Sequence, residues 1–199
     1  METLLPGFFP ATAMPDPDWW EALWPDPAQV VVKLGVEAQT EVVDLCCGDG
    51  LFTVPLARMN RHVIAIDLDP ALLDKARARL LRAGITNYDC FAIDAYQLAE
   101  VVREPVDFVL IANTFHGVPD QKRLSRAVAA ILKSGGRFAV VNWHRRPREE
   151  TQVLNQPRGP RTAMRMEPED VTAAVSSSGL RFERAIELPP YHYGVIYTK

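Results

Sequence analysis

The sequence predicts an α/β protein built on a doubly wound, mostly parallel sheet of seven strands. Short β-branched and apolar runs alternate with amphipathic stretches along the 199 residues, which is the order expected of βαβ units. The first strand leads into a loop that contains Gly48 and Gly50, and this loop leads into a helix. Only six residues separate the last two strands, 180–187 and 194–198. Because that gap is too short for a parallel crossover, the last strand is expected to run antiparallel.

Composition and charge narrow the classes of function. The chain is 48% apolar and 24% charged, which is ordinary globular usage and suits one α/β domain with a full core. The formal net charge of −3 gives no general reason to expect nucleic acid or an anionic membrane as a partner. The sequence contains no apolar run of about 18 residues and no secretory signal at its start. Since the three cysteines have neither disulfide nor zinc spacing, we expect reduced thiols and a cytoplasmic protein.

The first 25 residues differ in composition from the rest of the chain. They contain five prolines, which prevent a long helix, and five aromatic side chains: Phe8, Phe9, Trp19, Trp20 and Trp24. Such a segment needs a surface on which to pack. We expect residues 1–25 to form an arm that covers the sheet edge, or a lid over a ligand, and residues 26–199 to form the α/β domain.

Local signals set the bounds of the remaining elements. Two Asp-Pro pairs, at 26–27 and 69–70, each supply an N-cap followed by proline at the first helical position. Gly179 is a typical helix end, and the unbroken apolar run 106–112 is typical of a buried parallel strand. Residues 143–166 are expected to form a polar connector without clear structure, which is unusually long for a loop. The expected helices are 27–34, 51–59, 70–84, 119–132 and 168–178, and the expected strands are 42–45, 63–67, 88–93, 106–112, 137–142, 180–187 and 194–198.

The strand–loop–helix unit at residues 42–59 is typical of nucleotide binding. Glycines at 48 and 50 let the backbone turn sharply and let a ligand lie against the main chain. Asp67 closes the second strand 19 positions after Gly48, close to the roughly 20 expected for a carboxylate that binds ribose hydroxyls. Thr53 stands where the third glycine of the dinucleotide pattern would be, which disfavours a nicotinamide oxidoreductase.

The segment Asp44-Leu45-Cys46-Cys47-Gly48-Asp49-Gly50 resembles the first motif of the class I S-adenosylmethionine-dependent methyltransferases. That motif is an acid followed by three alternating glycines, and Cys46 replaces the first of them. The resemblance covers residues 26–199. It implies a Rossmann-like methyltransferase fold, S-adenosylmethionine as cofactor and methyl transfer to a small-molecule acceptor. A ligand-binding or regulatory protein on a degenerate methyltransferase fold is the alternative.

Ligands of such sheets bind outside the carboxyl ends of the strands. The resemblance implies Asp67 on the ribose, Leu68 against the adenine ring and Asp94 on the adenine amino group. Three acids at three successive strand ends favour cofactor binding over ordinary helix capping. The predicted cofactor-binding residues are Asp44, Cys46, Gly48, Asp49, Gly50, Asp67, Leu68, Asp94, Ala95 and Asn113.

Two histidines are candidate catalytic residues. His116 and His144 each follow an apolar strand by a few residues, so both are expected to face the ligand. An imidazole there can act as a general base, because its ordinary pKa lies near about 6.5. A metal with His192 as third ligand is the other use, although no local spacing supports it and no metal is predicted. The enzyme can also work by alignment alone, without a base.

The connector is rich in basic side chains. Arginines favour carboxylate or phosphate ligands, so one interpretation is an anionic small-molecule acceptor. A solvated loop, partly neutralised by Glu149 and Glu150, explains the same composition. A nucleic acid partner is not expected, because no added recognition domain accompanies the α/β domain. A membrane partner is not expected either, because the net charge gives no reason for one and no apolar run is long enough to span a bilayer. The basic residues are His144, Arg145, Arg146, Arg148, Arg158, Arg161 and Arg165.

Overall fold

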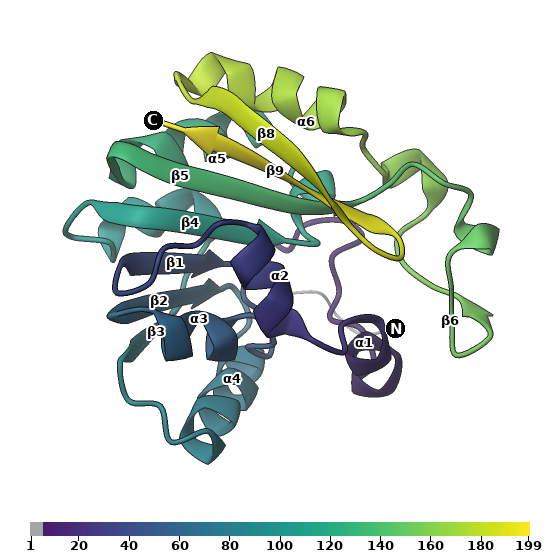
Figure 1. Cartoon of the computed structure of the whole chain (residues 1–199), viewed down its shortest axis with the longest axis horizontal. Helices are drawn as coiled ribbons and strands as arrows, with labels where there is room; N and C mark the ends of the chain where they lie inside the picture. The colour runs from purple at the N-terminus through teal and green to yellow at the C-terminus, as the bar shows by residue number, and fades with distance from the viewer. Residues whose placement is uncertain (1–5) are drawn as a thin grey trace.

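The computed structural model describes residues 6–199, so the first five residues of the expected arm lie outside the described part. Figure 1 shows one large twisted sheet with helices on both faces. Its strands are β1 Glu41–Leu45, β2 His62–Asp67, β3 Tyr88–Ala92, β4 Val106–Ala112, β5 Leu132–Trp143, β8 Arg181–Leu188 and β9 His192–Thr198. They lie in the order β3-β2-β1-β4-β5-β9-β8. The predicted fold class is confirmed.

Strand β9 is the one reversed strand of this sheet. It pairs antiparallel with β5 on one side and with β8 on the other. The pairs among β1, β2, β3, β4 and β5 are all parallel. The short turn between β8 and β9 forces this reversal, as the sequence predicts.

Helices cover the two faces of the sheet, and the alternation of β1 shows why. Val42 packs in the core beneath α2 and α3, whereas the next residue, Val43, packs in the core beneath α5 and α6. Successive side chains of a strand point to opposite faces, so a continuous apolar strand fills both cores. The helices are α1 Pro17–Leu23, α2 Pro27–Lys33, α3 Thr53–Met59, α4 Pro70–Arg82, α5 Gln121–Ile131 and α6 Pro168–Val175.

Several bounds differ from the sequence prediction for local reasons. Helix α3 begins at Thr53, two residues late, because the glycine loop continues through Phe52. Helix α5 begins after Asp120, whose side chain accepts a hydrogen bond from the Arg123 amide and so caps the helix. Strand β5 begins at Leu132, before the expected turn, and pairs with β4 through a register shift.

The prediction of an unstructured connector is wrong. The connector contains the 3₁₀ turns η3 Arg148–Glu150 and η4 Thr162–Met164 and a hairpin of β6 Gln152–Val153 and β7 Gln156–Pro157. Tyr191, in the β8–β9 turn, anchors this hairpin, because its hydroxyl exchanges hydrogen bonds with the Gln152 backbone.

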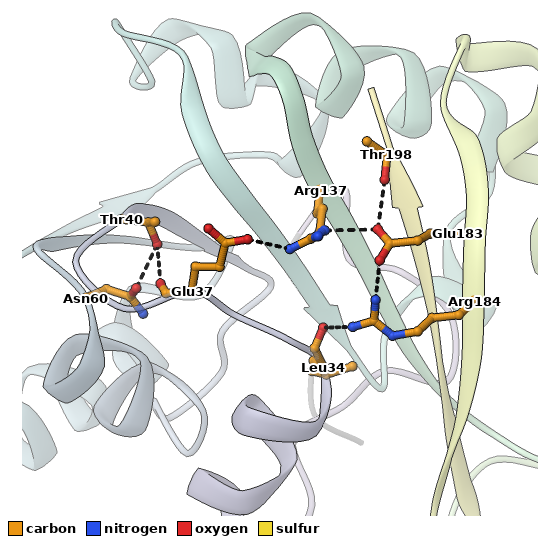
Figure 2. Close-up of polar contacts among 8 residues, drawn as sticks. All are labelled: Leu34, Glu37, Thr40, Asn60, Arg137, Glu183, Arg184 and Thr198. Carbon is orange, nitrogen blue, oxygen red and sulfur yellow. Dashed lines mark hydrogen bonds and ion pairs between the residues drawn. The ribbon is translucent and has the colours of Figure 1, made fainter.

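A polar network braces the sheet at the end opposite the connector (Figure 2). Arg137 of β5 contacts Glu37, in the segment after α2, and Glu183 of β8, at 2.9 Å each. Arg184 pairs with Glu183 and also donates to the Leu34 carbonyl at 3.2 Å. The network therefore ties the α2 segment to both C-terminal strands, and it leaves the carboxyl ends of the parallel strands free. Among the described residues, no helix is long and apolar enough to cross a membrane.

Candidate active site

A cavity of about 610 Å³ lies at the carboxyl ends of β1, β2, β3 and β4. The chain passes from β1 to β2 and β3 on one side and continues with β4 and β5 on the other. The β1–β4 boundary is therefore the point where strand order reverses, which is where open α/β sheets bind ligands. The cavity is lined by Asp44, Cys46, Gly48, Asp49, Asp67, Leu68, Asp94, Ala95, Asn113 and His116, which are all the predicted site residues except Gly50 and His144.

The loop after β1 has left-handed backbone at alternating positions. The φ angles are +58° at Cys46, +57° at Gly48 and +85° at Gly50. Cys46 therefore adopts the conformation that suits the glycine it replaces, so the loop keeps the shape that its motif implies. A Cβ on Gly48 would lie 2.9 Å from the sulfur of Met14, so Gly48 lets the arm approach the loop closely.

Gly50 serves the packing of the loop rather than the cavity. A Cβ there would lie 2.9 Å from the Cβ of Ala76 and 3.0 Å from its Cα, on helix α4. Gly50 thus lets the loop lie directly on α4, which holds the cavity-facing part of the loop in place. A side chain at position 50 would act on this packing rather than enter the ligand space.

Asp67 links the ends of β1 and β2. Its Oδ2 accepts a hydrogen bond from the Gly48 amide at 2.8 Å, and its Oδ1 accepts from the Asp69 amide at 3.0 Å. Burial raises the pKa of this carboxyl, and the backbone hydrogen bonds oppose that shift. A carboxylate has about four lone-pair sites, so both oxygens keep capacity for a ligand in the cavity.

Asp44 lies deeper, at the base of the cavity. Its Oδ2 accepts a 2.6 Å hydrogen bond from the hydroxyl of Thr53, at the start of α3. Burial raises the pKa of Asp44 to about 7. The hydroxyl of Thr53 thus holds Asp44, the acid that begins the motif, in place by this hydrogen bond.

The third acid, Asp94, follows β3. Its Oδ1 caps the 3₁₀ turn η1 Ala95–Glu100 by accepting from the Tyr96 amide at 2.9 Å. A Cβ added to Gly7 would lie 3.6 Å from Asp94 Oδ2 and 3.7 Å from a methyl group of Leu68. The arm therefore meets this corner of the cavity at a residue without a side chain.

Asp49 lines the cavity but already has a partner. Its Oδ2 lies 2.6 Å from Arg79 of α4, and the same arginine contacts Glu21 of α1 at 2.9 Å. Arg79 therefore joins the glycine loop to the first helix of the arm.

His116 is held between β5 and the arm. Its Nδ1 lies 3.1 Å from Oδ1 of Asn142, and its Nε2 lies 3.2 Å from the carbonyl oxygen of Ala11. Burial lowers the pKa of His116, which favours the neutral ring. Both ring nitrogens thus have neighbours in this state of the protein. The adjacent Gly117 lies under the arm, where an added Cβ would be 2.2 Å from the Pro10 carbonyl oxygen.

The two other candidate histidines, His144 and His192, lie outside the cavity lining. His144 faces the surface, with its Nε2 3.0 Å from Glu187 and its Nδ1 3.7 Å from Glu167. His192 is buried between the rings of Trp24 and Trp143, at centroid distances of 4.4 and 4.1 Å. Within residues 6–199, no three His, Cys, Asp or Glu side chains come together as a metal site.

Sequence reasoning offered the N-terminal arm as a lid but did not single out several of the arm residues that line the cavity. The arm contributes Thr12, Met14 and Pro15 to the cavity lining, beside the expected Trp19 and Trp20. No motif marks such residues, and proline and methionine are not signals for a binding site. The connector arginines Arg148, Arg158 and Arg161, noted for their charge, also line the cavity.

Comparison with known proteins identifies relatives of part of this chain. The profile of a family described as "Methyltransferase domain" matches residues 42–136, which span the glycine loop, α4 and β4. This part of the chain, just under half of its length, is therefore similar to that methyltransferase domain family. A ubiquinone biosynthesis O-methyltransferase of Xanthomonas axonopodis pv. citri (strain 306) is 31% identical over 139 residues. That match covers 65% of this chain but only 57% of the relative's length.

Solved structures of methyltransferases share the fold. A SAM-dependent methyltransferase from Aquifex aeolicus superposes with a TM-score of 0.74 at 22% identity, over 92% of this chain and 93% of that one. The N-methyltransferase NodS from Bradyrhizobium japonicum WM9, in complex with S-adenosyl-L-homocysteine, gives 0.71 at 16% identity, over 95% and 94%.

The cavity fits S-adenosylmethionine, the cofactor that the resemblance to methyltransferases implies. Both amide atoms of Asn113 are buried without a hydrogen-bond partner among the described residues, although Asn113 lines the cavity. Such atoms need a polar ligand or water, since a buried unpaired polar group is costly. The acids at the ends of β1, β2 and β3 suit the hydroxyl and amino groups of that cofactor.

Proposed function

We propose that this protein transfers the methyl group of S-adenosylmethionine to a small-molecule acceptor. The observation that carries the proposal is one cavity with Asp44, Asp67 and Asp94 at three successive strand ends. S-adenosylmethionine supplies an electrophilic methyl group on a sulfonium sulfur. The printed name of the Xanthomonas relative, a ubiquinone biosynthesis O-methyltransferase, supports a small-molecule acceptor.

In this proposal, each acid binds a different part of the cofactor. Asp67 accepts from the ribose hydroxyls with the lone pairs that its two backbone hydrogen bonds leave free. Asp94 accepts from the adenine amino group with Oδ2, and Leu68 packs against the adenine ring. Asp44 and the unpaired amide of Asn113 take the remaining polar groups of the cofactor.

Residues 1–25 act as a lid in this proposal, and residues 26–199 act as the methyltransferase domain. The described part of the arm supplies aromatic cavity residues, including Phe9, Trp19 and Trp20, which would keep water from the reacting groups. A covered cavity of this size admits a small molecule more readily than a protein or nucleic acid chain.

We assign the chemistry mainly to proximity and orientation. His116 is the predicted catalytic histidine that lines the cavity, and it can accept a proton only if Nε2 leaves the Ala11 carbonyl. Its first role is therefore to seat the arm. His144 would have to leave two glutamates to reach the cavity, so we assign it to the surface network.

Gly117→Ala tests the lid. The added methyl group would lie 2.2 Å from the Pro10 carbonyl oxygen and 2.5 Å from the Thr12 side chain, so the arm must move away. We expect about tenfold weaker binding of S-adenosylhomocysteine in calorimetry, since overpacking of this kind costs roughly 1–3 kcal/mol. Protease cleavage within residues 6–16 should become faster.

Gly136→Ala is the matched control, because its methyl group would meet the Lys133 and Asp107 carbonyls, far from the arm. It should change thermal stability but not the affinity or the cleavage of the arm. Unchanged affinity and unchanged cleavage in Gly117→Ala would show that residues 6–16 are not a lid.

The function itself is tested in two steps. Calorimetry should detect binding of S-adenosylmethionine and S-adenosylhomocysteine, and mass spectrometry should find no bound nicotinamide cofactor. Methyl-labelled S-adenosylmethionine should then transfer label to at least one member of a panel of small phenols, amines, thiols and acids. Absence of cofactor binding contradicts the proposal, whereas binding without transfer to any compound would favour the regulatory alternative.

A further inference from the structure

We propose that the acceptor is an aromatic acid whose carboxylate is bound by Arg148, Arg158 and Arg161 of the connector. This inference rests on the proposed function and names its substrate class. All three arginines line the cavity, and within residues 6–199 none of them makes an ion pair with an acidic side chain. Other arginines of the chain, such as Arg145 and Arg137, do have such partners. Three unneutralised guanidinium groups on one wall favour an anionic ligand.

Arg158 gives the strongest evidence for an anionic ligand. Its Nε is buried and has no hydrogen-bond partner among the described residues. Its guanidinium lies over the ring of Trp19, 5.2 Å from the centroid, so the group is held in place by the arm. A buried donor on a fixed cation needs an acceptor, and the cavity is where a ligand can bring one.

Arg148 is held in place by a hydrogen bond. Its Nε donates to the Gly159 carbonyl at 3.0 Å, which leaves the terminal nitrogens for a ligand. Gly159 itself lies against the ring of Trp143, where an added Cβ would be 2.9 Å from the ring atoms. The arginine wall is therefore fixed to an aromatic side chain that also lines the cavity.

The fully buried Arg165 organises the connector that carries this wall. Its guanidinium donates to the carbonyls of Arg146, Arg158 and Pro160 and to the Thr151 hydroxyl, at 2.8–3.1 Å. No carboxylate takes part in these contacts, so the buried charge adds to the positive field of the wall. Arg165 is thus a positioning residue for Arg158.

The cavity is polarised from one end to the other. Acidic side chains lie at the strand ends, and the arginines lie on the connector side. The lining also contains the aromatic side chains of Trp19, Trp20 and Trp143. Flat apolar walls suit an aromatic ring, and a cationic wall suits its carboxylate. This combination selects an aromatic acid over a neutral phenol or an aliphatic amine.

The experiment compares matched acids and amides. Calorimetry in the presence of saturating S-adenosylhomocysteine would measure binding of benzoate, cinnamate and indole-3-carboxylate and of their neutral amides to the whole chain. At least one acid should bind about tenfold or more tightly than its amide. Arg158→Gln should remove most of that difference and leave the affinity for S-adenosylhomocysteine within about twofold of wild type.

Arg146→Gln is the control, because it removes the same charge from an exposed connector residue outside the cavity lining. It should leave the acid preference intact. Failure of all the acids to bind, or equal binding of acids and amides, overturns the inference. A loss of S-adenosylhomocysteine affinity in Arg158→Gln also overturns it, since the arginines would then bind the cofactor's carboxylate. If wild type does not bind S-adenosylhomocysteine at all, the proposed function fails first.

Discussion

Asp67→Ala is expected to weaken binding of S-adenosylmethionine by more than tenfold, up to about a hundredfold. The variant removes the proposed ribose contact, and a hydrogen bond to a charged group contributes about 1.5–3 kcal/mol. It also frees the Gly48 and Asp69 amides, which lie 2.8 and 3.0 Å from the carboxylate. The variant therefore loses the hydrogen bond that joins the glycine loop to β2 as well as the proposed contact with the ligand. Calorimetry with S-adenosylmethionine and with S-adenosylhomocysteine measures the effect.

Asp89→Ala provides the comparison, because Asp89 lies on the neighbouring strand β3 and contacts the partly exposed His62 rather than the cavity. Its affinity for both ligands should equal that of wild type. Equal affinity in Asp67→Ala and wild type would contradict the ribose assignment, whatever the change in thermal stability.

Asp44 should make the protein less stable as the pH rises from about 4 to about 7. In the unfolded chain this carboxyl ionises near its ordinary pKa of 3.8, whereas burial raises its pKa to about 7 in the folded protein. Between these values the unfolded state releases a proton that the folded state keeps, so ionisation favours unfolding. The contribution of Asp44 to stability is complete below the pKa of the unfolded state. It is lost as the pH rises through the pKa of the folded state. The two pKa values of Asp44 differ by about three units, which corresponds to about 4 kcal/mol in the free energy of unfolding.

Asp44→Asn isolates this contribution, because the amide oxygen can still accept from Thr53 but carries no charge. Urea unfolding at pH 5 and pH 8 should show wild type losing a few kcal/mol more than the variant over that interval. Asp74→Asn, on the exposed side of α4, serves as the control and should follow wild type. Parallel pH dependences in wild type and Asp44→Asn would contradict the assignment.

The parts of the fold that depend on local signals were predictable from the sequence. Asp26 and Asp69 each accept a backbone hydrogen bond at the start of a helix, as their Asp-Pro pairs predict. The apolar run of β4 and the short β8–β9 turn predict the buried centre and the reversed strand. The strand-end acids line one cavity, because parallel strands bring their carboxyl ends to one edge of the sheet.

Features that depend on contacts distant in sequence were not predictable. The order of the connector depends on one buried arginine, Arg165, and nothing in its neighbours' sequence distinguishes it from six other basic residues. The role of Gly50 depends on Ala76, a residue on another element. His144 follows a strand, as expected, but Glu167 and Glu187 from two later segments hold it at the surface.

The positions of Lys199 and Gly7 have a practical consequence for anyone who labels or immobilises this protein. The terminal residue Lys199 is tied by its backbone to Gly135 and Gly136 and by its ammonium to the Leu132 carbonyl, across the molecule from α1 (Figure 1). A fluorophore or affinity tag attached after Lys199 would therefore leave ligand exchange undisturbed. The same tag placed just before Gly7 would hang from a residue of the cavity wall, and would report on the opening of the arm while also altering it.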